Sequence, residues 1–436
     1  MKKRCTILLI AIFLMICNTA SAQEYVSISE IYEQAQAMGG VWQETFETKN
    51  GTMTVDVPII VPDVDAMPVM TMEKARPSNE MFDQIASGKK LGKEDDHEYE
   101  TEMNGEIINF FLGRDNYWAF GKETNNVGYD AFQFLVMEHG GYRNKEETGM
   151  GIKRAWPRSY HYPWEIDPDA AYVRDSDITL NEAMRLWHED LALCYPGEDF
   201  VIRPTLVQFG GSTLAVNSTQ KNKRTGDIVI EYAEQLIDGI PLMGAITEGC
   251  DVYGGASTAE KTKIEEKTLG GYYLGSYNVN QWNYFYGFFT DEENYRTSST
   301  LARVRTTEYM DVPLASLDSV LESIKEKIEA GNIRRIFSIK LGYLLYSDPG
   351  MTDYAWAIPR WQVKADYVKD GMEKNAKYKP HTQAHVDRSE GSNEARRYFV
   401  NLPIDAQSGE LIIFSSGSKK NAEVYKVPKI VTWDDI

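Results

Sequence analysis

The chain has 436 residues and a formal net charge of −19, and hydrophobic residues make up 42% of it, as in globular proteins. Its excess of acidic groups repels nucleic acid phosphates and anionic lipid headgroups, so we expect neither as a partner. A chain of this length has room for two or three domains and can bury a sizeable core without disulfides or metals.

The first 22 residues have the layout of a secretory signal peptide. Basic residues follow Met1, residues 6–17 are apolar, and the small residues 20–22 (Ala-Ser-Ala) fit the signal peptidase rule. The apolar run is shorter than the roughly 20 residues that a membrane-spanning helix needs, which disfavours a retained anchor. Lipid anchoring at Cys17 is disfavoured as well, because the large residue Ile16 precedes it. We therefore expect a secreted chain with no membrane span after cleavage.

Cleavage after Ala22 removes three positive charges and leaves a mature net charge of −22. It also removes two of the four cysteines, so that Cys194 and Cys250 remain. Cysteines of exported chains often pair, because the compartment is oxidising. The sequence allows either a disulfide between Cys194 and Cys250 or two free thiols, and we carry the disulfide as a hypothesis.

The start of the mature chain predicts a helix and then a hairpin. Ser27 and Glu30 have the spacing of a capping box, and apolar residues recur at helical spacing until Gly39 and Gly40. Residues 42–48 and 52–57 then alternate on either side of an Asn-Gly turn signal, as the two strands of a hairpin do.

Less regular sequence follows up to residue 175. The polar, charged stretch 73–104 predicts a loop or solvated surface. A second hairpin is expected from 107–112 and 117–121. Residues 140–175 are rich in Gly, Pro, Arg and aromatic residues, which indicates irregular structure at a domain boundary.

The second half of the sequence contains the same order of elements twice. Thr179 and Glu182 predict a capping box that opens a helix through Leu193, and Ser316 opens a second helix that ends before Gly331. Strands are expected after the first helix at 200–209, 227–236 and 240–246. They are expected after the second helix at 333–345, 361–367, 398–402 and 410–414.

The fold class expected from this order is α+β, with antiparallel sheets, helices packed on one face, and two helix-then-strands units in the second half. We divide the mature chain into an N-terminal α+β region with hairpins (23–170), a first helix-plus-sheet unit (171–300) and a second helix-plus-sheet unit (301–436).

Two turn-centred stretches resemble PepSY-type modules of exported proteins from Gram-positive-type bacteria. Residues 230–242 resemble a strand, a Gly-Ile-Pro turn and a returning strand of those modules, and residues 404–412 resemble their closing hairpin. Residues 361–363 (Trp-Gln-Val) resemble a central strand of the secreted relatives. The resemblance covers about half of the mature chain and none of residues 23–170. It implies a non-enzymatic module that binds or restrains a partner, often a peptidase, and it carries over no catalytic residue.

Catalytic and metal-binding motifs are absent or incomplete in this sequence. The sequence has no His-Glu-x-x-His pair for zinc and no Gly-x-Ser-x-Gly nucleophile turn. Ser-x-x-Lys occurs twice, at Ser218 and Ser416, without the companion motifs that a penicillin-binding enzyme needs. We therefore predict no catalytic residue, no metal ligand and no cofactor.

One segment has a composition suited to ligand binding. Aromatic residues with Asn and Gln neighbours can stack on sugar rings or hold extended peptides, although a buried β-rich segment has the same composition. The candidate binding aromatics are Tyr272, Tyr273, Tyr277, Trp282, Tyr284 and Tyr286.

We thus expect an exported, non-enzymatic binding or regulatory protein that acts on a peptidase or cell-envelope partner, which is a protein or a peptide. The alternative is a glycan-binding protein or a carbohydrate-active hydrolase of the cell envelope. The hydrolase version needs two carboxyl groups about 5–10 Å apart in a cleft near the aromatic segment.

Overall fold

The computed structural model describes 15 stretches of the chain. They are residues 24–48, 51–75, 89–91, 98–103, 106–112, 118–123, 153–173, 176–214, 223–243, 285–291, 294–299, 301–346, 354–367, 400–412 and 428–436. The predicted signal peptide lies outside them, so its cleavage stays a prediction.

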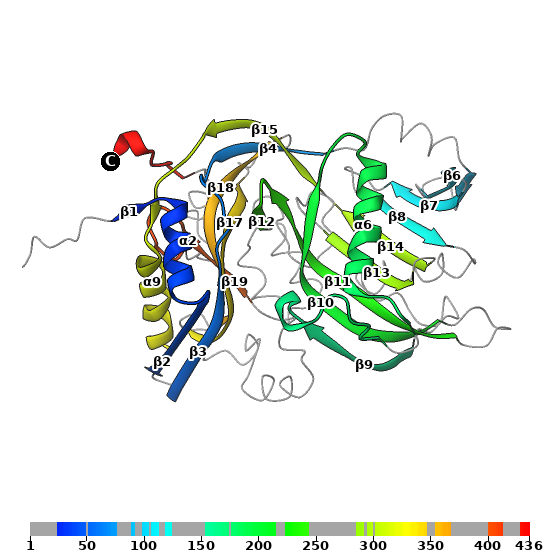
Figure 1. Ribbon diagram of the computed structural model, residues 1–436, viewed down its shortest axis with the longest axis horizontal. Coiled ribbons are helices and arrows are strands. Elements are labelled where there is room, and N and C mark those ends of the chain that lie inside the picture. Colours follow the sequence, from blue (N-terminus) through cyan, green and yellow to red (C-terminus); the bar gives the residue numbers. More distant parts are fainter. Residues whose placement is uncertain are drawn as a thin grey trace, which may run out of the picture.

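The fold is mixed, with few helices and mostly strands, nearly all of which pair into one curled network (Figure 1). The helices are α2 (Ile28–Ala37), α6 (Leu180–Cys194) and α9 (Leu317–Glu329). The longer strands are β2 (Val41–Thr48), β3 (Gly51–Ile60), β4 (Val69–Lys74), β9 (Lys153–His161), β10 (Val201–Leu214), β11 (Lys223–Ile237), β15 (Ala302–Tyr309), β17 (Ile333–Tyr346) and β18 (Tyr354–Tyr367).

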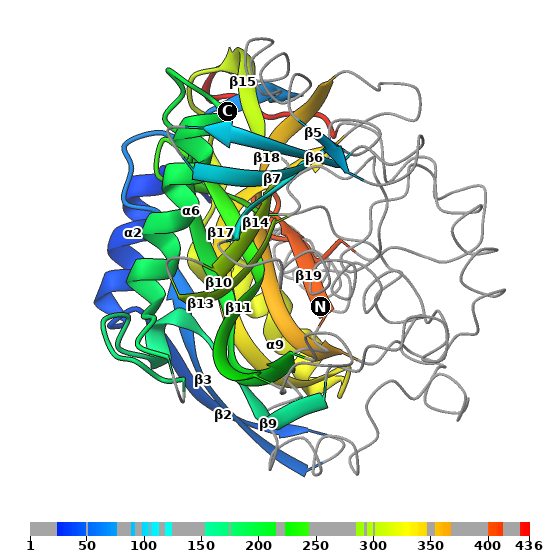
Figure 2. The ribbon, with the colours of Figure 1, turned by 90° about the vertical axis from the view of Figure 1, so that its right-hand side faces the viewer.

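Shorter strands complete the fold. They are β1 (Tyr25–Val26), β5 (Lys89–Leu91), β6 (Glu98–Met103), β7 (Glu106–Leu112), β8 (Trp118–Glu123), β12 (Ile240–Met243), β13 (Phe285–Asp291), β14 (Asn294–Ser299), β16 (Leu314–Ala315) and β19 (Val400–Asp405). Among them, β1 and β16 pair with each other in a separate two-stranded sheet. Two 3-10 turns, η2 (Pro163–Glu165) and η6 (Trp433–Asp435), lie among the described residues. In Figure 2, α2 and α6 lie along the same side of the molecule.

The first helix and hairpin form as predicted. The Ser27 side chain accepts the N–H of Glu30, and the Glu30 carboxylate accepts the N–H of Ser27, so the capping box is complete. Gly39 and Gly40 both have positive φ, which a glycine adopts without strain, and the chain leaves the helix there. β2 and β3 then pair antiparallel along their whole length.

The repeated order of elements is present as well. We name α6, β10, β11 and β12 the first helix-and-hairpin unit, and α9, β17, β18 and β19 the second helix-and-hairpin unit. In each unit a helix precedes two long antiparallel strands and one short strand. The hairpin strands are longer than expected, because β10 continues to Leu214 and β18 already begins at Tyr354.

Three local expectations need correction. Thr179 does cap α6 by accepting the N–H of Glu182, but the Glu182 carboxylate pairs with Arg185, which lies one turn further along. The strand expected at 410–414 consists, as far as residue 412, of one bridge between Ile404 and Leu411. Polar or irregular composition also concealed strands, because β5 and β6 lie in 73–104 and β9 lies in 140–175.

One sheet network joins regions that are far apart in the sequence. β12 pairs antiparallel with β11 and parallel with β17, so it links the two helix-and-hairpin units. Gly342 of β17 lies at this junction, where an added Cβ would collide with the carbonyl oxygen of Pro241. β3 also pairs with β17, and β8 pairs with β14. The division at residues 170 and 300 stays a prediction.

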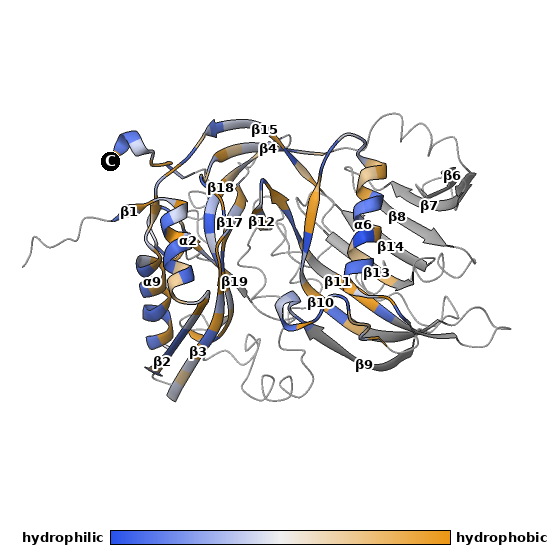
Figure 3. Cartoon of the chain, viewed as in Figure 1, coloured by the Kyte–Doolittle hydropathy of each residue, from blue (hydrophilic) through white to orange (hydrophobic). Residues whose placement is uncertain are grey.

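The apolar core has two main clusters. The larger one contains residues of α2, α9, β2, β3, β17 and β18, with Trp361 and Ile324 fully inside. The second contains residues of α6, β10 and β11, with Trp187 against Phe289. In Figure 3, α2, α6 and α9 each carry both hydrophilic and hydrophobic residues, as expected for helices with one buried side. Among the described residues, no helix has the length and hydropathy needed to cross a membrane.

Candidate functional site

The β17–β18 hairpin carries a buried polar face. Successive side chains of a strand point to opposite sides of the sheet, and the register pairs Lys340 with Gln362 and Gly342 with Arg360. Lys340, Arg360, Gln362 and Lys364 therefore share one side of the hairpin. They are between 1% and 6% exposed, although Lys and Arg are almost never this buried unless they are paired. The alternate residues of the same strands, such as Leu341 and Val363, belong to the larger apolar cluster.

Glu234 of β11 is the anion at the centre of this face. It pairs across the hairpin with Arg203 of β10, whose Nη2 lies 2.6 Å from its Oε1. Its other oxygen accepts a hydrogen bond from the Lys340 ammonium of β17. The carboxylate thus bridges a cation of its own helix-and-hairpin unit and a cation of the other one.

The charges of this cluster hold each other in place. Burial alone would raise the pKa of Glu234, but Lys340 and Arg203 outweigh it and keep the pKa below its usual value. Glu234 is therefore an ionised hydrogen-bond acceptor, and it is a poor general acid at neutral pH.

Lys364 has the most perturbed amine of the cluster. Burial lowers its pKa to about 7, the neighbouring Lys340 lowers it too, and Glu234 partly opposes both effects. Its Nζ lies 5.7 Å from the ring centroid of Tyr162, which also contacts Phe337 of β17. An amine with this pKa exchanges its proton near neutral pH, and such perturbed groups are found most often at functional sites.

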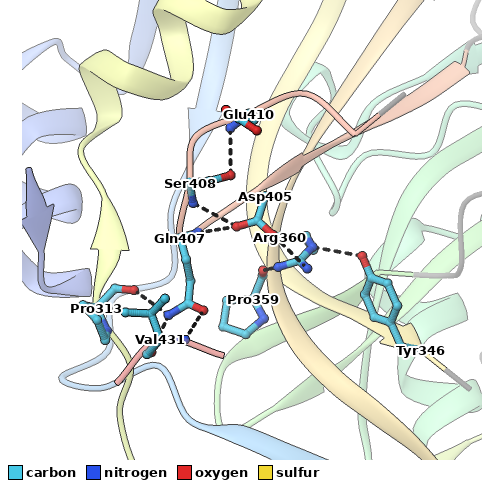
Figure 4. Close-up of polar contacts among 9 residues, drawn as sticks. All are labelled: Pro313, Tyr346, Pro359, Arg360, Asp405, Gln407, Ser408, Glu410 and Val431. Carbon is cyan, nitrogen blue, oxygen red and sulfur yellow. Dashed lines mark hydrogen bonds and ion pairs between the residues drawn. The ribbon is translucent and has the colours of Figure 1, made fainter. Parts of the chain in front are cut away.

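A second polar cluster lies at the end of the β18–β19 hairpin (Figure 4). Arg360 donates from Nε to the Tyr346 hydroxyl at 2.9 Å, and its Nη2 lies 3.0 Å from Asp405 Oδ2. Asp405 Oδ1 in turn accepts the backbone N–H groups of Gln407 and Ser408. The aspartate therefore shapes the turn and neutralises a buried guanidinium at once.

The other side of that turn is tied to the C-terminal segment. The Gln407 amide donates to the carbonyl oxygens of Pro313 and Val431, and its oxygen accepts the N–H of Val431. Gly409 has a φ of 71°, and its carbonyl oxygen accepts a hydrogen bond from Ser323 of α9. These contacts give the second cluster a structural role.

The residues singled out from the sequence lie elsewhere. The aromatic candidates at 272–284 are outside the described residues, and Tyr286 is described only as a backbone position of β13, paired with Ser298. Cys194 is fully buried at the end of α6 and forms no disulfide with a described residue, and burial raises the pKa of its thiol. Its expected partner Cys250 is outside the described residues, so the disulfide stays a prediction. Within the described residues, no three His, Cys, Asp or Glu side chains gather as metal ligands do.

Sequence reasoning did not single out the buried charges. The sequence does contain a sign of these buried charges, because charged and apolar residues alternate there. Lys340 lies between Ile339 and Leu341, and Lys364 lies between Val363 and Ala365. The usual interpretation of that pattern places the charged side chains in water. Here Glu234, which is more than 100 residues from Lys340 in the chain, lies against them.

No family model matches the chain. A 6-phospho-beta-glucosidase from Clostridium longisporum is 29% identical over 113 residues, which are 26% of this chain and 22% of that protein. An uncharacterized protein from Eubacterium rectale ATCC 33656 has a solved structure that superposes with a TM-score of 0.43 at 13% identity, over 88% of this chain and 99% of that one. The chain thus matches about a fifth of the length of the curated relative.

Proposed function

We propose that the chain is an exported, non-enzymatic binding or regulatory protein, PepSY-like in residues 171–436, which acts on a peptidase or another partner in the cell envelope. The observation that carries the proposal is the repeated order of a capped helix, a long hairpin and a short strand in the two helix-and-hairpin units. In each unit, residues of the helix and of its hairpin belong to the same apolar cluster.

The local geometry of both PepSY-like stretches supports this proposal. Asp238 and Gly239 both have positive φ, 49° and 82°, and form the tight turn between β11 and β12. The turn from Asp405 to Gly409 closes on itself through the Asp405 side chain and the positive φ of Gly409. Both stretches were singled out by sequence because of their turns.

The state of the buried polar groups supports binding over catalysis. Glu234 is held ionised between two cations, and Asp405 is engaged by a guanidinium and two backbone N–H groups. Both carboxylates are therefore engaged in contacts within the protein.

The proposal is tested with the mature chain, residues 23–436, carrying a photo-reactive amino acid at exposed surface positions. The protein is crosslinked in the native cell envelope, and the crosslinked species are identified by mass spectrometry. A partner that reappears with purified components, and whose activity or assembly state changes on binding, is the expected result. The proposal would be contradicted if no position yields a crosslinked partner. It would also be contradicted if secretion persists whatever change is made to residues 1–22.

A second function is favoured by one observation, the partial match to a 6-phospho-beta-glucosidase. We propose as the alternative a glycan-binding protein or carbohydrate-active hydrolase of the cell envelope. A panel of phosphorylated and unphosphorylated β-glucosides distinguishes the two functions. Turnover by the homogeneous protein supports the hydrolase. If turnover is lost during purification, the hydrolase function is excluded.

A further inference from the structure

β15 is an edge strand of the sheet network. Among the described residues it pairs with β4 alone, from Ala302 opposite Lys74 to Tyr309 opposite Val69, with register shifts between Val304 and Thr306 and between Thr307 and Tyr309. It runs along the top of the molecule in Figure 1, above β4. Ala302 is buried, and each of the next seven residues is exposed. A strand in this position presents a row of backbone groups that can pair with another chain.

Gln235 shows how the outer edge of β15 accepts a partner. Its side-chain amide donates to the carbonyl oxygen of Ala302 at 2.6 Å and accepts the N–H of Ala302 at 2.9 Å. These are the two hydrogen bonds that a neighbouring strand would make. Since backbone groups alternate in direction along a strand, the N–H and C=O of Val304 point the same way as those of Ala302.

Apolar side chains gather at the far end of the edge. Tyr309 is 39% exposed and Met310 76%, and Trp433 of η6 is 41% exposed. The Trp433 indole donates to Asp311 at 2.7 Å, which holds the ring beside the end of β15. Apolar groups clustered on a surface commonly mark a binding site.

β15 carries three exposed charged residues, Arg303, Arg305 and Glu308. Arg303 is held by Glu73 and Glu198. Arg305 makes no ion pair with any described residue, and its guanidinium lies 4.9 Å from the ring centroid of Tyr354. An exposed arginine without an ion pair among the described residues favours an acidic side chain in the ligand.

We propose that the outer edge of β15, from Val304 to Tyr309, binds an extended segment of a partner protein as an added strand. The backbone groups of the edge are satisfied by another extended backbone, which gives affinity. An acidic side chain of the segment lies on Arg305, and an apolar one lies on Tyr309, Met310 and Trp433, which gives specificity. This inference rests on the proposed binding function and names the surface that carries it.

The test selects phage-displayed 12-residue peptides on the immobilised mature chain and measures their affinity for variants. Val304→Pro removes the outward N–H, while Val304→Thr keeps it and serves as the matched control. Arg305→Glu reverses the charge, and Arg305→Lys retains it. Alternate-residue N-methylation of the best peptide repeats the backbone test without any change to the protein, so a misfolded variant does not decide the result.

The expected peptides carry an acidic and an apolar residue. Their affinity falls at least about tenfold with Val304→Pro, Arg305→Glu or N-methylation, and stays within about threefold for the two controls. Equal binding to all variants, recovery of no peptide, or a concentration-dependent dimer that Val304→Pro abolishes would each overturn the inference. An envelope partner captured equally by Val304→Pro sinks the edge site and leaves the binding function standing. Peptide binding without any envelope partner sinks the binding function instead.

Discussion

The two helix-and-hairpin units share an order of elements and differ in what covers their hairpins. Every residue of β17 from Ile336 to Leu345 is buried, whereas in β10 Val201 is exposed and 203–205 are partly buried. The second unit has α2 and α9 on the apolar side of its hairpin and the first unit against its polar side. In the first unit, α6 packs with the hairpin in the second apolar cluster, and part of the hairpin is open to solvent.

This difference explains why the charges are distributed as they are. The fully covered hairpin of the second unit carries Lys340, Arg360 and Lys364, and a carboxylate of the first unit compensates one of them. Buried ion pairs contribute little net stability, but removing one partner leaves an uncompensated charge. The two units therefore depend on each other more than their separate cores suggest, and each prediction below probes that dependence.

The largest effect is expected from Glu234→Gln. The change leaves Lys340 buried without a carboxylate and should lower the free energy of unfolding by about 3–5 kcal/mol. Glu189→Gln in α6, which breaks an exposed pair with Arg185, is the control and should cost less than about 0.5 kcal/mol. Urea denaturation measures the free energy of unfolding of both variants. Equal losses of stability would contradict the buried ion pair between Glu234 and Lys340.

The next largest effect is expected from a comparison of the two turn aspartates, Asp405 and Asp238. Asp405→Asn keeps the turn acceptors but removes the charge facing Arg360, and should cost about 1.5–3 kcal/mol. Asp238→Asn alters an exposed turn residue at positive φ, which Asn tolerates, and should change stability by less than about 0.5 kcal/mol. Thermal unfolding compares the two variants, and a larger loss for Asp238→Asn would reverse the interpretation.

Gly342→Ala tests the junction between the units. The added methyl group meets the Pro241 backbone and should cost about 1–3 kcal/mol while separating β12 from β17. Gly287→Ala in β13 meets the Trp187 and Phe289 rings instead, so it should loosen α6 alone. Hydrogen exchange resolves the two sites. Unchanged protection of β12 in Gly342→Ala would show that the junction does not need the glycine.

Lys364→Met should have the smallest effect on stability and the clearest effect on pH dependence. The folded pKa of about 7 lies below the usual lysine value of 10.5, so between these values the unfolded chain holds a proton that the folded chain lacks. Stability contributed by this residue is therefore greatest above pH 10.5, falls as the pH drops to 7, and is constant below that. Lys364→Met should remove this slope and raise stability at pH 7 by about 1 kcal/mol. If the slope of stability against pH persists in the variant, the slope belongs to another titratable group.

Sequence predicted the features that are decided locally. The Ser27 capping box, the turn within residues 230–242 and the helix-then-hairpin order of the second half depend on residues within a few positions of each other, and all are present. The α+β expectation is met at the level of mixed helices and mostly antiparallel strands, with two parallel pairings, β3–β17 and β12–β17, that local patterns do not reveal.

The candidate site depends on contacts over long distances in the chain, and these were missed. Alternation at Lys340 and Lys364 shows that both point to one side of a hairpin, but not that Glu234 and Tyr162 cover that side. β6 and β9 were missed because their residues are polar or interrupted by proline, and pairing with other strands outweighs such weak local preferences.

The most direct test of the account is a double-mutant cycle between Glu234→Gln and Lys340→Met. The central claim is that the buried ion pair between β11 and β17 makes one cooperative body of the two helix-and-hairpin units. We predict a coupling energy of at least about 2 kcal/mol and a single unfolding transition in the wild-type chain. Additive losses within about 0.5 kcal/mol, or two separate transitions, would contradict the claim.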